Sequence, residues 1–184
     1  MGKKIVVTPQ QSTVGGLIEG AFSEIGSLAE EMREAYDNTP ESLQQSGAGE
    51  ARGTAADELE NHVDAPDVHE SLVDLPATYT PLAQRRRGYS RSDRRSQATY
   101  ELQVAVDALG EVVSSSEDAI TAKEAEIEQA ESGDATEEQK NSLDALQAEL
   151  EKLEEKRDAA QELIDELDNA ISEVDGVEFP GMYG

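Results

Sequence analysis

The feature that most constrains this chain is a regularly spaced apolar seam near its C-terminus. Its ten positions alternate steps of three and four residues, and nine of the ten are apolar. The seam consists of Leu143, Leu146, Leu150, Leu153, Arg157, Ala160, Ile164, Leu167, Ile171 and Val174. Because the residues between them are mostly charged, polar or small, this heptad pattern predicts a long helix that buries one narrow stripe against another helix.

A second long helix is expected to precede the seam. Apolar residues recur at helical spacing from Ser92 or Ser96 to Glu131, and Ser132-Gly133-Asp134 follows as a turn. Thr136-Glu137-Glu138-Gln139 then has the pattern of a capping box, which opens the seam helix. We therefore predict an antiparallel coiled-coil hairpin over residues 96–174, about 55 Å long at 1.5 Å rise per residue. Arg157 either pairs across this hairpin or extends to water.

The N-terminal segment, residues 1–63, is expected to hold two helices. The first is capped by Ser12 or Thr13 and ends at Asn38-Thr39-Pro40, and the second lies within residues 46–63. Four glycines lower the helix propensity of the first helix, so it needs a packing surface. Its candidate docking face, against the base of the hairpin or against a partner protein, consists of Leu17, Phe22, Ile25 and Met32.

Two further regions link and end these helices. Residues 64–95 contain Pro66, Pro76 and Pro81, which predict an extended connector with one short turn near His69. Residues 175–184 form a C-terminal tail. With 4% aromatic residues and no Trp, the chain lacks the side chains of a thick globular core. The expected fold class is therefore all-α, with the hairpin as its main part.

The net charge of −26 is large for a chain of 184 residues, and it is unevenly placed. Residues 1–84 carry a net charge of −11, residues 85–95 one of +5, and residues 96–184 one of −20. Such a field favours solubility, repels nucleic acids and membrane surfaces from most of the molecule, and attracts basic partners.

The short positive region is an arginine cluster at the start of the first hairpin helix. Its candidate interaction residues are Arg85, Arg86, Arg87, Arg91, Arg94 and Arg95. Cations are disfavoured at a helix N-terminus, so something anionic should compensate for them. Internal pairing with the acidic end of the hairpin, at Glu173, Asp175 and Glu178, is the first explanation. An acidic partner or a neighbouring copy is the second, and nucleic acid is the third.

No pattern in the chain is typical of catalysis or metal binding. There is no Cys, no G-x-S-x-G elbow and no glycine-rich phosphate loop. His62 and His69 lie near carboxylates, but their spacing matches no common metal-ligand pattern. We therefore predict no enzymatic activity, no catalytic or metal-binding residues and no cofactor.

The middle third of the chain resembles small acidic proteins encoded by tailed bacteriophages. The resemblance rests on Glu31-Met32-Arg33-Glu34, Asp37–Gln44, Gly49-Glu50, Ala55–Glu60, Pro66-Asp67-Val68, Arg85-Arg86-Arg87 and Ser90–Arg95. It implies a phage origin and assigns no role to any residue.

Two functions from different classes fit these observations. The first is a phage structural or assembly protein that acts through contacts with protein subunits or copies of itself. The second is an acidic DNA mimic that inhibits a host defence or DNA-binding enzyme. We expect the protein in the virion or the host cytoplasm, with neither a membrane nor nucleic acid as a partner. The N-terminal apolar stretch is too short for a secretory signal, and no run approaches the ~18 apolar residues of a membrane span.

Overall fold

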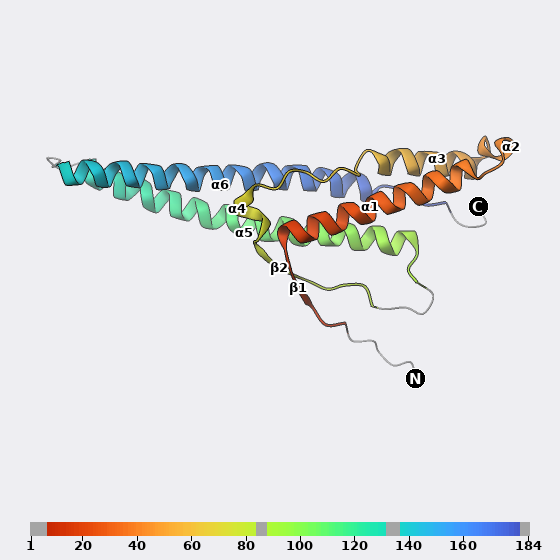
Figure 1. Cartoon of the computed structure of the whole chain (residues 1–184), viewed down its shortest axis with the longest axis horizontal. Coiled ribbons are helices and arrows are strands. Elements are labelled where there is room, and N and C mark those ends of the chain that lie inside the picture. Colours follow the sequence, from red (N-terminus) through yellow and green to blue (C-terminus); the bar gives the residue numbers. More distant parts are fainter. Residues whose placement is uncertain (1–6, 84–87, 132–136, 181–184) are drawn as a thin grey trace.

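The computed structural model describes residues 7–83, 88–131 and 137–180, and the chain is predominantly helical (Figure 1). Side chains of residues 137–141 are outside this description. The elements are β1 (Gln10–Thr13), α1 (Val14–Asp37), α2 (Glu41–Gln44), α3 (Gly47–Glu60), α4 (Glu70–Val73), β2 (Pro76–Tyr79), α5 (Arg91–Glu131) and α6 (Glu137–Asp175).

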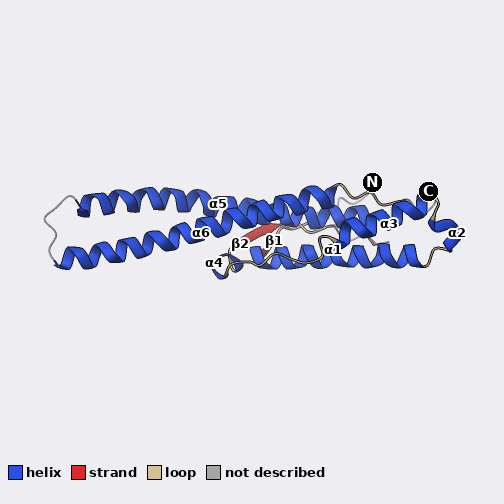
Figure 2. Cartoon of the chain, turned by 90° about the horizontal axis from the view of Figure 1, so that it is seen from above, coloured by secondary structure: helices blue, strands red, loops and turns tan. Residues whose placement is uncertain are grey.

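The two longest helices, α5 and α6, lie side by side and run antiparallel (Figures 1 and 2). The predicted turn at Ser132–Asp134 and the predicted cap at Thr136 lie outside the described residues. Helix α5 begins at Arg91 because Ser90 and Asp93 bond to each other's backbone N–H in the manner of a capping box. The expected starts at Ser92 and Ser96 were therefore slightly late.

Helix α1 packs against α5 and α3 of the same chain. The structure selects Thr13 as its cap, since the Gly16 N–H donates to Thr13 Oγ1 at 3.1 Å. The predicted docking face is buried in the shared core, where the exposed fractions are 2% for Leu17, 4% for Phe22, 0% for Ile25 and 1% for Met32. The packing surface that α1 needs is thus supplied by its own chain.

Helix α3 is fixed to α1 by packing and charge. Ser46 caps it, and Ala55, Ala56 and Leu59 enter the core. The Arg33 guanidinium of α1 reaches Asp57 Oδ1 at 2.5 Å and Glu60 Oε2 at 2.7 Å. The helix ends at Glu60, so Val63, which sequence periodicity placed at its end, lies beyond it with 39% exposure.

Two strands, which the sequence did not predict, join the ends of the N-terminal half. Strand β1 pairs antiparallel with β2, and Gln10 lies opposite Tyr79 while Thr13 lies opposite Pro76. Figure 2 shows this small sheet near the start of α1. The predicted extended connector, residues 64–95, therefore contains α4 and β2, and strand pairing holds residues 76–79. Its last five residues, 91–95, belong to α5.

The molecule has a body and an arm. The body's core runs from α1 and α3 to Val112 on α5 and Ala160 on α6. Beyond it, residues 114–131 of α5 and 137–158 of α6 extend as a pair of helices, here called the arm (Figure 1). At 1.5 Å per residue, the arm's part of α5 is about 27 Å long.

The residues of the predicted seam are buried to different extents in the arm and in the body. In the arm, Leu143, Leu146, Leu150 and Leu153 are half-buried. In the body, the predicted Ile164 and Ile171 are also only half-buried, whereas Leu163, Ala170 and Val177 are almost fully buried beside Leu167. The buried stripe of α6 widens in the body because α3 and α4 pack on it in addition to α5.

Candidate interaction surfaces

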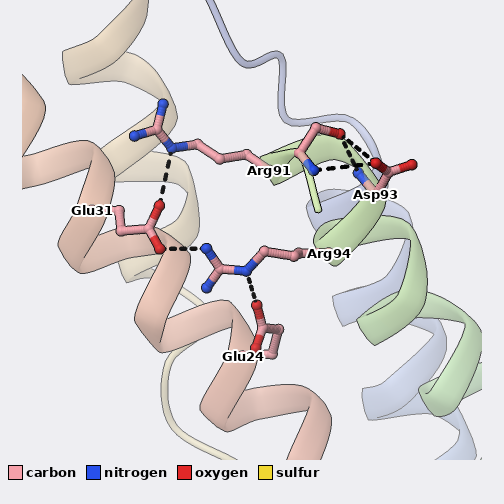
Figure 3. Close-up of polar contacts among 6 residues, drawn as sticks. Glu24, Glu31, Arg91, Asp93 and Arg94 are labelled. Atoms are coloured by element: carbon pink, nitrogen blue, oxygen red, sulfur yellow. Dashed lines mark hydrogen bonds and ion pairs between the residues drawn. The ribbon is translucent and has the colours of Figure 1, made fainter. Parts of the chain in front are cut away.

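The start of α5 places its arginines against α1 (Figure 3). Arg91 Nε donates to Glu31 Oε2 at 3.2 Å. Arg94 lies between two carboxylates of α1, with Nε bonded to Glu24 and one terminal nitrogen bonded to Glu31. Arg91 and Arg94 are about one turn apart on α5, and Glu24 and Glu31 are about two turns apart on α1. This spacing places Arg94 between the two carboxylates and leaves Arg91 beside Glu31.

These contacts change the ionisation of the groups involved. Burial alone would raise the pKa of Glu31, but hydrogen bonds and positive charge from Arg94 and Arg91 hold it below its usual value. Burial likewise opposes the charge of Arg94, and its two carboxylate partners outweigh that effect and raise its pKa. Both shifts favour the charged forms of Glu31 and Arg94.

Arg95 holds the C-terminal segment that follows α6. One of its terminal nitrogens donates to the Val177 carbonyl oxygen, and the other lies 3.6 Å from Asp175 Oδ1. The Phe179 ring centroid is 5.8 Å from the guanidinium carbon, within the range of a cation–π contact. Arg95 Nε is buried and has no hydrogen-bond partner in the described part of the chain.

The sequence predicted these arginine contacts in part. Asp175 was an expected partner, and it pairs with Arg95. Arg94 was expected there too, but it turns to α1, whose position against α5 no local pattern revealed. Internal pairing therefore accounts for Arg91, Arg94 and Arg95. Arg85, Arg86 and Arg87 lie outside the described residues.

Both histidines contact glutamates of α6. His62 Nε2 is 2.6 Å from Glu173 Oε2, and His69 Nε2 is 3.9 Å from Glu155 Oε1. The His69 Nδ1 atom also accepts from the Ser71 N–H at the start of α4. Within the described ranges, no three His, Asp or Glu side chains form a group suited to a metal ion. The histidines instead attach the 61–69 segment to α6.

A hollow of about 340 Å³ lies between α1, α5 and the residues Pro81, Leu82 and Tyr89. Glu24, Arg94, Gln97 and Glu101 are among the side chains that line it. Burial, together with the nearby charge of Glu24, raises the pKa of Glu101, although a hydrogen bond from Gln97 works in the other direction. Among the described carboxyl groups, Glu101 is the one whose pKa is raised above its usual value, and Tyr89 lies in the same lining.

The arm carries charge around its half-buried leucines. Its two helical stretches contain 14 acidic and 5 basic residues. Lys123 joins the helices, because its Nζ lies 3.0 Å from Glu149 Oε2 on α6 and 3.1 Å from Glu126 Oε2 on α5. Arg157 turns to its neighbour Asp158 at the surface and makes no described ion pair across the hairpin. The surface of the arm is therefore mainly negative.

The exposed side of α6 in the body is also acidic. No Lys or Arg follows Arg157 in the sequence. An open hollow on this helix is lined by Asp158, Gln161, Glu162, Asp165, Glu166 and Asn169. Between Asp158 and Asp168, five carboxylates occur over about 15 Å of helix, or about one per 3 Å. One strand of DNA carries about one charge per 3.4 Å.

The chain was compared with protein-family models, curated proteins and solved structures, and nothing matched. No described helix combines the length and the hydropathy required to cross a lipid bilayer.

Proposed function

We propose that this chain is a non-enzymatic phage structural or assembly protein that acts through protein–protein contacts. In this proposal the body is a self-contained unit and the arm, an antiparallel coiled coil, reaches a neighbouring subunit in the virion. The observation that supports it best is the arm itself, which extends past the body's core.

The energetics of the arm favour a contact role. Its α6 leucines are only half-buried, so the arm gains less from burial than the body does. A helix pair that projects beyond a core adds little stability to that core. Its acidic surface would select a basic subunit and speed the encounter with it.

The experiment is quantitative mass spectrometry of purified particles of the encoding phage, combined with an arm deletion. In the deletion, residues 114–158 are replaced by a short glycine-containing turn, which leaves the body's core residues in place. We expect a fixed copy number per particle for the wild type and failure of the deletion to support particle formation. A matched control exchanges the exposed Asp165 and Glu166, which lie in the body and outside the arm, for their amides and should assemble normally.

A protein that is missing from particles, or an armless variant that assembles like the wild type, would contradict this proposal. Either result would favour the second candidate.

The second candidate is an acidic inhibitor that imitates DNA, and the carboxylate row on α6 favours it. The row has about the charge density of one DNA strand. Arg91, Arg94 and Arg95 do not interrupt it, because the first two pair with α1 carboxylates and the third with Asp175. Arg157 pairs with Asp158 at the start of the row and leaves the other four carboxylates unpaired with it. The test is inhibition of a panel of host restriction nucleases. Replacing Asp165, Glu166 and Asp168 by their amides should abolish inhibition if this candidate is right, whereas the Glu124/Glu128 amide variant should retain it.

A further inference from the structure

The small sheet has one edge that faces α5. The Val14 N–H donates to the Leu75 carbonyl oxygen at 2.9 Å, directly after the paired residues Thr13 and Pro76. In an antiparallel ladder, alternate residues direct both of their backbone groups to the partner strand. The Leu75 carbonyl and, after it, the backbone groups of Ala77 and Tyr79 therefore point to β1, while the Leu75 N–H donates to the Leu72 carbonyl oxygen. Thr78 directs its N–H and C=O to the opposite side.

Contacts just beyond β2 show what lies on that side. The Thr80 N–H donates to Tyr100 Oη at 3.3 Å, and the Thr80 carbonyl oxygen accepts from Gln97 Nε2 at 3.4 Å. Both partners belong to α5. Thr78, two residues earlier on the same edge, makes no backbone hydrogen bond outside the β1–β2 ladder among the described residues, and its place in the ladder directs its N–H and C=O away from β1. Such an edge is a template for another strand.

A groove of about 480 Å³ follows this edge. Residues 76–78 of β2 form one wall, and α5 contributes Tyr100, Val104, Asp107, Ala108 and Glu111. Val104 and Ala108 are half-buried, and Tyr100 is 40% exposed, so the wall on α5 offers apolar area to a bound side chain. Asp107 and Glu111 are exposed carboxylates, and the lining contains no Lys or Arg.

We propose that this groove binds a short, extended, positively charged peptide segment of a partner protein. The segment adds a third strand to the sheet by pairing with Thr78. Its apolar side chains contact Val104 and Ala108, and its Lys or Arg side chains approach Asp107 and Glu111. Since Pro76 has no N–H and the backbone of Thr80 is already bonded, the pairing covers about four residues at ~3.4 Å each. The groove and the arm share no residues. A failure of peptide binding can therefore be distinguished from a failure of the proposed function of the arm.

A second copy of the chain fits the groove less well. Pairing of β2 with β2 of another copy would bring the carboxylates of both grooves together, and like charges at short range oppose association. A basic segment is instead attracted to the chain, whose net charge is −26.

The test is fluorescence anisotropy of the full-length protein with a fluorescein-labelled Lys-Val-Lys-Val-Lys-Val peptide. Because any cationic peptide is drawn to this chain, the decisive control is the same peptide N-methylated at every backbone amide, since methylation of alternate amides would leave one edge of the peptide able to pair. That control keeps the charge and prevents strand pairing. We expect the N-methylated peptide to bind about tenfold more weakly or worse.

Three protein variants locate the site. Thr78→Pro removes the outward N–H of β2, and Val104→Arg fills the groove without touching the sheet. Each should weaken binding by about tenfold. Gln11→Pro is the matched control, because Gln11 lies opposite Thr78 and directs its N–H to the free edge of β1. It should bind within about twofold of the wild type.

Equal binding of the N-methylated peptide would overturn the proposal, and so would wild-type affinity in Val104→Arg. Loss of binding in Gln11→Pro alone would place the site on the other edge. Self-association of the free protein that Val104→Arg abolishes, measured by light scattering, would assign the groove to a second copy and contradict the peptide.

Discussion

Replacing Leu28 by Ala tests whether α1 belongs to the core of the isolated chain. Leu28 is 0% exposed and lies in the cluster that joins α1 to α5 and α6. A fully buried Leu→Ala change costs about 2–5 kcal/mol, from lost transfer free energy and the cavity left behind. Because Leu28 is fully buried, we expect about 3 kcal/mol for Leu28→Ala, within this range.

The assay is urea unfolding followed by far-ultraviolet circular dichroism. With a denaturant slope of about 2 kcal/mol per molar, a loss of 3 kcal/mol lowers the midpoint by about 1.5 M. Leu150→Ala in the arm is the matched control. Its side chain is half-buried, so about 1 kcal/mol is expected. If both variants unfold at the wild-type midpoint, or if only Leu150→Ala is destabilised, α1 is not part of the core and the reasoning fails.

Three further predictions follow from single contacts. The lowered pKa of Glu31 means that its charged form stabilises the fold; this contribution is complete above the ordinary glutamate pKa and is lost as pH falls through the folded-state pKa. Glu31→Gln should therefore cost about 1 kcal/mol or less at pH 7, since the carboxylate is 40% exposed, and progressively less in thermal unfolding as the pH falls through the folded-state pKa; a difference that does not change with pH would contradict this. Gly49→Ala should lower the free energy of unfolding by about 1–3 kcal/mol in the same assay, because a Cβ there would lie 2.4 Å from two backbone carbonyl oxygens. Gly110→Ala, with open space around it, should instead raise the free energy of unfolding by up to about 1 kcal/mol. Arg95→Gln should speed amide exchange at Val177, and unchanged exchange would show that another contact holds the C-terminal segment.

Local sequence signals predicted the long helices well. The apolar period predicted α6, and Pro40, which cannot continue a helix, marked the end of α1. Pro66 did not mark the end of α3, which ends earlier, at Glu60. The cap at Thr13 and the pairing of Arg95 with Asp175 were also among the stated alternatives. All of these depend on neighbours in sequence or on the hairpin register.

Contacts between distant segments could not be predicted in the same way. The strands have the sequences Gln-Gln-Ser-Thr and Pro-Ala-Thr-Tyr, which lack clear alternation, and a proline argues against a central strand. Arg94 was assigned to the wrong carboxylates because the position of α1 is fixed only by core packing. Leu163 and Ala170 were missed because a strict heptad describes a two-helix seam, and more than one element covers α6 in the body.

Hydrogen exchange of the isolated, monomeric chain tests the central claim, a self-contained body that carries an exposed arm. Slow exchange requires buried, cooperative structure. The account predicts that amides of α1 from Leu17 to Met32 exchange as slowly as those of α5 near Leu102, and that amides around Leu146 and Leu150 in the arm exchange faster. Exchange of the α1 amides within seconds, beside a uniformly protected hairpin, would contradict it, because α1 would then fold only with a partner.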